Sequence, residues 1–216
     1  MKKTADNINI IGKSDGPTSV FIAGKGEKKT LRQKIEKSMY DFRRTRVIKS
    51  LRADPHTVDE VADYLVRELG YTEVSPEDEE YQTEYSDLRA SFLMQYHPEL
   101  LGDIAEPQRP QQWDEKSAME FMEQIKQRTE AARAVPKTEF DIDFHLYRKT
   151  GRDFQMSISI EKTYESFSGS ASGSTRAMRR YGADFRKVYR YYGVSQEDIR
   201  QRTKRFDEVV RQLTVR

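Results

Sequence analysis

The chain has no cysteine, only three histidines and a single tryptophan among its 216 residues. The absence of cysteine excludes disulfides, thiol catalysis and cysteine metal sites, and is typical of a reducing compartment. No apolar run approaches the roughly 20 residues that a membrane-spanning helix needs, and the mean hydropathy is −0.90. The N-terminal MKKTADNINI lacks the apolar segment of a secretory signal. We therefore expect a soluble, cytoplasmic protein that does not insert into a membrane.

The composition predicts a modest core beneath a heavily charged surface. Hydrophobic residues make up 36% and charged residues 34% of the chain, and the aromatic content of 11% argues against global disorder. Thirty-eight basic residues oppose thirty-six acidic ones, so the net charge alone requires neither a nucleic acid nor a membrane as partner. The length predicts a single α+β domain over residues 1–216, with the proline-rich residues 98–112 as a candidate internal linker.

Apolar residues at three-to-four-residue spacing predict five to six helices. Thr30, the Thr57–Glu60 capping box, Ser75 and Ser195 are helix-start signals, and Gly70 and Gly193 are helix-stop signals. In the first helix the apolar face, which we expect to pack on the core, consists of Leu31, Ile35, Met39, Phe42, Val47, Ile48 and Leu51. In the helix over 114–132 we expect Phe121, Met122 and Ile125, with Trp113 before it, to face inward. The predicted helices cover residues 31–53, 57–69, 75–96, 114–132, 175–192 and 195–213.

Alternating apolar and polar residues over 140–147 and 154–161 predict an antiparallel hairpin with one buried face. The runs Ile8–Ile11 and Val20–Ala23 predict a second hairpin. We expect it to join the first, since an isolated hairpin is marginal in water. The Ser/Gly run 166–174 is interpreted as a flexible loop. The expected fold class is α+β: a small antiparallel sheet of two hairpins packed with five to six helices.

A tight polar turn, Lys13–Thr18, joins the two N-terminal apolar runs. Asp15-Gly16 favours a turn, and Pro17 prevents a central strand from continuing through it. A phosphate-binding loop is excluded. Asn7 occupies the position where that motif needs its first glycine, and Asp15-Gly16-Pro17 prevents an immediate helix.

Gly12 and the following Asp15-Gly16-Pro17-Thr18 resemble the sodium-site segment of the β subunit of sodium-translocating carboxylic acid decarboxylases. The resemblance covers about sixteen of the 216 residues and departs from that family at Lys13 and Ser14. It implies an ion-coupling role at the position of Asp15, but the chain lacks the apolar spans of a transporter, so the decarboxylase function does not transfer. The chain is also similar to short, soluble, uncharacterised bacterial proteins with the same segment, a resemblance that implies no activity.

No nucleophile–base pair, metal cluster or cofactor loop stands out, so we predict no catalytic residue, metal or cofactor. His56 and His97 adjoin prolines at helix ends. His145 lies level with Asp141 and Asp143 on the predicted strand, where an acid–base or metal site and an ordinary exposed sheet face are both open interpretations.

The favoured function is therefore that of a non-catalytic interaction or regulatory protein with a protein partner of unknown identity. One alternative is nucleic-acid binding through the basic helices 31–53 and 175–192, where cations interleave with tyrosines. The competing interpretation is that these charges form only a solvated, acid-paired helix face. A second alternative is an ion-binding protein or enzyme that uses Asp15, Gly16 and Thr18. The candidate nucleic-acid contacts in the later helix are Arg176, Arg179, Arg180, Arg186, Lys187 and Arg190.

Overall fold

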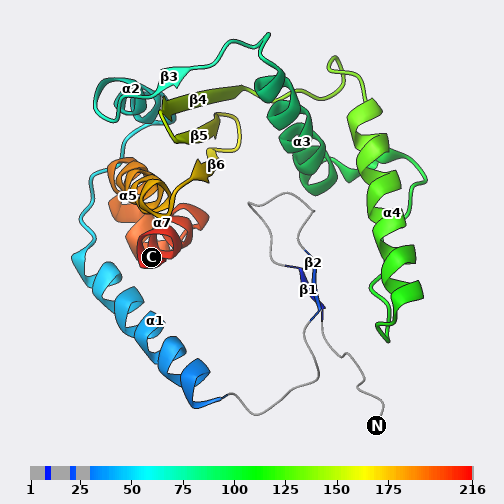
Figure 1. Cartoon of the computed structure of the whole chain (residues 1–216), viewed down its shortest axis with the longest axis horizontal. Helices are drawn as coiled ribbons and strands as arrows, with labels where there is room; N and C mark the ends of the chain where they lie inside the picture. The colour runs from blue at the N-terminus through cyan, green and yellow to red at the C-terminus, as the bar shows by residue number, and fades with distance from the viewer. Residues whose placement is uncertain (1–7, 11–19, 23–29, 216) are drawn as a thin grey trace. The chain divides into compact units, whose positions relative to one another are not determined.

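The structure is a computed structural model, which describes residues 8–10, 20–22 and 30–215. These residues form seven α-helices, one 3-10 helix and a four-stranded antiparallel sheet, with a separate two-stranded sheet near the N-terminus (Figure 1). The α+β class is confirmed. The described helices exceed the expected number because the last predicted helix divides into two.

The described residues fall into two compact units. The helical unit includes Ser75–Asp143, and the sheet unit consists of residues 30–74 and 144–215. Residues 98–112, the candidate linker, lie inside the helical unit between two of its helices. The single-domain organisation stays a prediction.

The N-terminal hairpin consists of β1 (Ile8–Ile10) and β2 (Val20–Ile22), which pair antiparallel as predicted. The expectation that it joins the larger sheet is wrong, because β1 and β2 form a sheet of their own. Two segments that we did not assign as strands complete the larger sheet instead.

The larger sheet has the order β3-β4-β5-β6. Its strands are β3 (Thr72–Glu73), β4 (Phe144–Gly151), β5 (Phe154–Glu161) and β6 (Ser166–Gly173). The β4–β5 hairpin is confirmed, although β4 begins at Phe144 rather than at residue 140. The predicted single buried face is wrong for β5, where Ser157, Ser159 and Glu161 are buried along with the apolar residues. The cause is that β5 is a central strand whose polar side chains bond locally: Ser159 to Ser168 at 2.6 Å, and Glu161 to the amides of the following turn.

The Ser/Gly run is strand β6 and not a flexible loop. It pairs with β5 along its whole length, from Ser166 opposite Glu161 to Gly173 opposite Phe154. A Cβ atom on Gly169 would lie 2.4 Å from the carbonyl oxygen of Ser157 and 2.7 Å from the hydroxyl of Tyr181. The small residues are therefore needed because the strand passes close to both β5 and a covering helix.

The helices follow the predicted start signals with two exceptions. Thr30, Thr57, Asp114 and Ser195 each accept a backbone N–H at a helix start. The third helix begins at Glu79 with Asp78 as its cap, and the chain breaks at Arg202 (φ 52°), after which Thr203 caps a new helix. The helices are α1 (Leu31–Ser50), α2 (Val58–Arg67), α3 (Glu79–Tyr96), η1 (Pro98–Leu101), α4 (Glu115–Ala134), α5 (Thr175–Tyr192), α6 (Gln196–Gln201) and α7 (Lys204–Thr214).

The core of the sheet unit forms where α2, α5 and α7 pack with the sheet. Leu65 of α2, Ile158 of β5, Val188 of α5 and Val209 of α7 are all fully buried. In the helical unit, Leu93 of α3 and Phe121 of α4 are buried. None of the helices that the structure describes is long and apolar enough to cross a membrane.

Candidate functional site

Three arginines fix the packing of α3 and α4 in the helical unit. Arg89 of α3 is 4% exposed and donates through Nε to the carbonyl oxygen of Phe140 at 2.9 Å and through Nη2 to that of Val135 at 2.6 Å. Arg128 of α4 donates to the carbonyl oxygen of Ile104 at 3.0 Å. Arg133 of α4 forms an ion pair with Asp87 of α3 at 2.6 Å. The two helices and the segments that follow them are thereby held at a fixed spacing.

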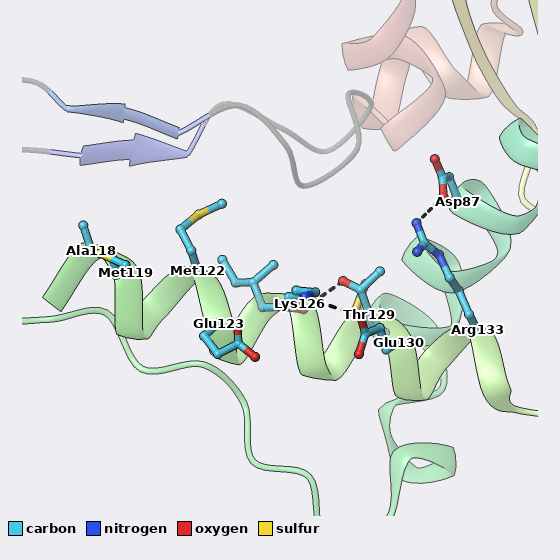
Figure 2. Close-up of a pocket in the computed structure, with 11 residues that line it drawn as sticks. Asp87, Ala118, Met119, Met122, Glu123, Lys126, Thr129, Glu130 and Arg133 are labelled. Carbon is cyan, nitrogen blue, oxygen red and sulfur yellow. Dashed lines mark hydrogen bonds and ion pairs between the residues drawn. The ribbon is translucent and has the colours of Figure 1, made fainter. Parts of the chain in front are cut away.

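A groove of about 660 Å³ runs along one face of α4, and Asp87 and Met94 of α3 also line it (Figure 2). Ala118, Met122, Ile125 and Thr129 of α4 line it at three-to-four-residue spacing, as residues on one helix face do. Met94 comes from α3, and Met119 lies beside Met122. The groove is therefore lined mainly by methionine and other apolar side chains.

The groove methionines are open to solvent, since Met119 is 68% and Met122 41% exposed. The prediction that Met122 faces the core is wrong. The prediction that Phe121 faces inward is confirmed, since it is buried and lies edge-to-face with Trp113 at 5.4 Å. Helical spacing alone does not distinguish the exposed Met122 from the buried Phe121 beside it.

The charged residues of the groove form its rim and are largely paired. Arg133 forms an ion pair with Asp87, and Nζ of Lys126 lies 4.0 Å from Oε1 of Glu130 (Figure 2). No histidine or serine lines the groove among the described residues, and no group of His, Asp and Glu in the described part could hold a metal ion. The chemistry available here is apolar contact bordered by charge, because methionine is flexible and polarisable and adapts to irregular apolar partners.

The six candidate nucleic-acid contacts lie on the outer face of α5, within about a third of the helix circumference at 3.6 residues per turn. Ala177, Val188 and Tyr192 are buried on its other side. Lys187 pairs with Asp184 at 3.1 Å, and the guanidinium of Arg180 lies 5.8 Å from the ring of Phe154. No carboxylate of the described residues forms an ion pair with the remaining four, Arg176, Arg179, Arg186 and Arg190.

The tyrosines that alternate with these cations point elsewhere. Tyr189 and Tyr192 are buried, and burial raises the pKa of each hydroxyl well above its ordinary value. Their hydroxyls donate to Glu208 at 3.0 Å and Glu165 at 2.7 Å. Tyr191 stacks on His56 at 3.9 Å and on Tyr64 at 4.3 Å. These three rings are structural parts of the sheet unit, so they are not available to stack on the bases of a nucleic acid.

The apolar residues of the first half of α1 are exposed, contrary to prediction. Leu31, Ile35, Met39 and Phe42 are 75%, 52%, 49% and 64% exposed. The predicted packing of Val47, Ile48 and Leu51 on the core is confirmed, and Arg44 lies 3.8 Å from Asp207 of α7. The five-residue step from Phe42 to Val47 is the sequence signal of this change of face.

The histidines are held by separate partners. His145 Nδ1 lies 2.7 Å from Glu73 across β3 and β4, whereas Asp141 precedes the strand and accepts a hydrogen bond from Tyr85. Nδ1 of His56 contacts the carbonyl oxygen of Tyr191 at 2.6 Å, and His97 pairs with Glu99 at 3.0 Å. In the described part of the chain, His145 belongs to no group of three or more histidine and carboxylate side chains that could hold a metal ion.

Asp15, Gly16 and Thr18 lie outside the described residues, and their proposed role stays a prediction. The sequence also contains a charge asymmetry that the total conceals. Residues 75–143 hold 17 acidic and 7 basic residues, whereas residues 29–74 and 144–216 together hold 26 basic and 16 acidic residues. The helical unit is thus strongly acidic and the sheet unit strongly basic.

Comparison with known proteins gives no relative from which to transfer a role, because no protein-family model, curated protein or solved structure matches the chain.

Proposed function

We propose that this chain is a non-catalytic interaction protein whose α3–α4 groove binds the apolar face of an amphipathic helix of a protein partner. The observation that carries this proposal is the methionine-lined groove, whose apolar floor is open and whose rim is charged. Helix-in-groove recognition uses apolar anchors on one face of the bound helix. Methionine-rich surfaces suit it because they repack around different partners.

The dimensions of the groove fit a short helix. From Ala118 to Thr129 the lining of α4 extends for about 16 Å at 1.5 Å per residue, which is about three helical turns. A bound helix of that length presents three or four apolar side chains to Met119, Met122 and Ile125. The flanking Glu123 and Lys126 can then pair with charges beside its apolar face.

The test is fluorescence anisotropy with a labelled amphipathic peptide made of leucine and lysine. A peptide of the same composition, scrambled to remove its continuous apolar face, is the control for simple charge attraction to the acidic helical unit. We expect the amphipathic peptide to bind and the scrambled one to bind at least tenfold more weakly. The double substitution Met119→Gln/Met122→Gln should weaken binding of the amphipathic peptide by about tenfold or more.

Met178→Gln is the matched control, because Met178 of α5 is 44% exposed, close to the 41% of Met122, and lies outside the groove. It should bind the peptide as the wild type does. Equal binding of both peptides, or equal weakening in the groove and control variants, would contradict the proposal.

Nucleic-acid binding by α5 is a second candidate, supported by a separate observation. Among the described residues no carboxylate pairs with Arg176, Arg179, Arg186 or Arg190, and the sheet unit carries a large excess of basic residues. A stripe of unpaired cations attracts a phosphate backbone, and the affinity of such binding falls steeply with salt. The ion-binding or enzymatic alternative at Asp15, and the cytoplasmic location, remain predictions.

A further inference from the structure

The exposed apolar residues of α1 form one continuous stripe. Leu31, Ile35, Met39 and Phe42 recur every three to four residues, which places them on one face of the helix. Val47 and Leu51, which pack on the core of the sheet unit, lie on roughly the opposite side at 3.6 residues per turn. The stripe therefore points away from the elements that hold α1, and no residue of α1 is buried.

The α1 stripe and the groove match in length and in charge. From Leu31 to Phe42 the stripe extends for about 16 Å, the same number of residues as the groove lining from Ala118 to Thr129. The helix α1 holds seven basic and two acidic residues, whereas α3 and α4 together hold eight acidic and five basic residues. A basic helix with an apolar stripe is what an apolar groove on an acidic unit attracts, since complementary charge favours and orients association.

We propose that the occupant of the groove is α1 of a second copy of this chain. Each copy contributes one stripe and one groove, so a dimer in which each copy inserts its stripe into the partner's groove contains two identical contacts. This inference rests on the proposed function, because it names the partner of the same groove.

The experiment is sedimentation velocity on the full chain from about 1 µM to about 200 µM, a range that covers dissociation constants typical of weak and moderate dimers. The wild type should form a dimer within this range. Ile35→Asp/Phe42→Asp, which alters the stripe, and Met119→Asp/Met122→Asp, which alters the groove, should each lower the association constant by about a hundredfold or more. The decrease is large because each double substitution affects both contacts of the dimer.

Mixing the two variants gives the decisive result. A stripe variant retains its groove and a groove variant retains its stripe, so the mixture can form one intact contact and should recover a dimer that neither variant forms alone. Val66→Asp is the matched control, since Val66 of α2 is 45% exposed and belongs to neither surface, and it should dimerise as the wild type does. Far-UV circular dichroism confirms that each variant is folded.

A wild type that stays monomeric throughout, a dimer unaffected by both double substitutions, or a mixture that recovers nothing would each overturn the inference. The peptide experiment on the groove is independent of these outcomes. A monomer whose groove binds the peptide refutes self-association and leaves the proposed function standing. A groove that binds no peptide in a monomeric chain refutes both.

Discussion

Replacing Arg89 tests whether buried polar contacts hold the walls of the groove in place. The side chain is 4% exposed, and its guanidinium makes two hydrogen bonds to the carbonyl oxygens of Val135 and Phe140. It also lies 5.9 Å from the ring of Phe140. Arg89→Met keeps much of the aliphatic length but removes both donors, so α3 loses its bonds to the segment that follows α4.

The magnitude follows from the number and kind of these bonds. A hydrogen bond from a charged group contributes about 1.5–3 kcal/mol, so two of them contribute about 3–6 kcal/mol. Methionine avoids the desolvation cost of a buried guanidinium, which offsets part of this effect. We therefore expect Arg89→Met to lower the free energy of unfolding by about 2–4 kcal/mol, a large part of the roughly 5–15 kcal/mol typical of a folded protein.

Urea unfolding followed by tryptophan fluorescence is the assay, because Trp113, the single tryptophan, lies in the helical unit beside Phe121. Arg133→Met is the control. It removes an exposed ion pair between the same two helices, and such pairs contribute about 1 kcal/mol or less. A decrease below about 0.5 kcal/mol for Arg89→Met, or one no larger than that of Arg133→Met, would refute the reasoning.

Three further predictions concern the sheet, the acid response and the basic helix. Gly169→Val should lower the melting temperature strongly, because its side chain would meet the Ser157 carbonyl; an unchanged thermal midpoint would contradict the close approach of β6. Burial acts to raise the pKa of Asp141, but hydrogen bonds from the Tyr85 hydroxyl and the Ile142 amide outweigh it and lower that pKa. The ionised Asp141 therefore stabilises the fold above the ordinary pKa of about 4, and this stabilisation is lost as the pH falls through the lowered pKa. Tyr85→Phe should flatten the dependence of the free energy of unfolding on pH in acid, and an unchanged dependence would count against this role of Tyr85. Finally, Arg176→Gln, Arg179→Gln and Arg190→Gln on α5 should weaken the binding of short double-stranded DNA. The slope of log affinity against log salt concentration should fall by about one unit for each cation that no longer neutralises a phosphate. An unaltered slope would exclude the helix as a DNA-binding surface.

Local signals in the sequence were sufficient for much of the fold. Thr57 and Glu60 form the predicted capping box, and α5 runs from Thr175 to Tyr192 and stops at Gly193, as expected. These features depend on backbone hydrogen bonds within a few residues, so a sequence pattern can indicate them. The alternation that predicted β4 and β5 is similarly local.

The features that the sequence did not indicate depend on tertiary contacts. Ser and Gly in β6 suggest a loop by composition, but the strand needs small residues because of the Ser157 carbonyl and the Tyr181 hydroxyl, both distant in sequence. The outward stripe of α1 has the same periodicity as a buried face. The five-residue step from Phe42 to Val47 indicates that the apolar face changes there, but only the position of the core shows which of the two faces is buried. Of the candidate site, the basic face of α5 could be predicted from helical spacing, whereas the groove requires α3 and α4 together.

Methionine methyl NMR tests the central claim, that the α3–α4 groove binds an apolar helix, most directly. The chain has seven methionines, and those of the groove are Met94, Met119 and Met122, while Met156 and Met178 lie in the sheet unit. On addition of the amphipathic leucine–lysine peptide, we predict saturable shifts of the three groove methyl signals and none at Met156 or Met178. Unchanged groove signals at saturating peptide, or shifts confined to the sheet unit, would contradict the claim.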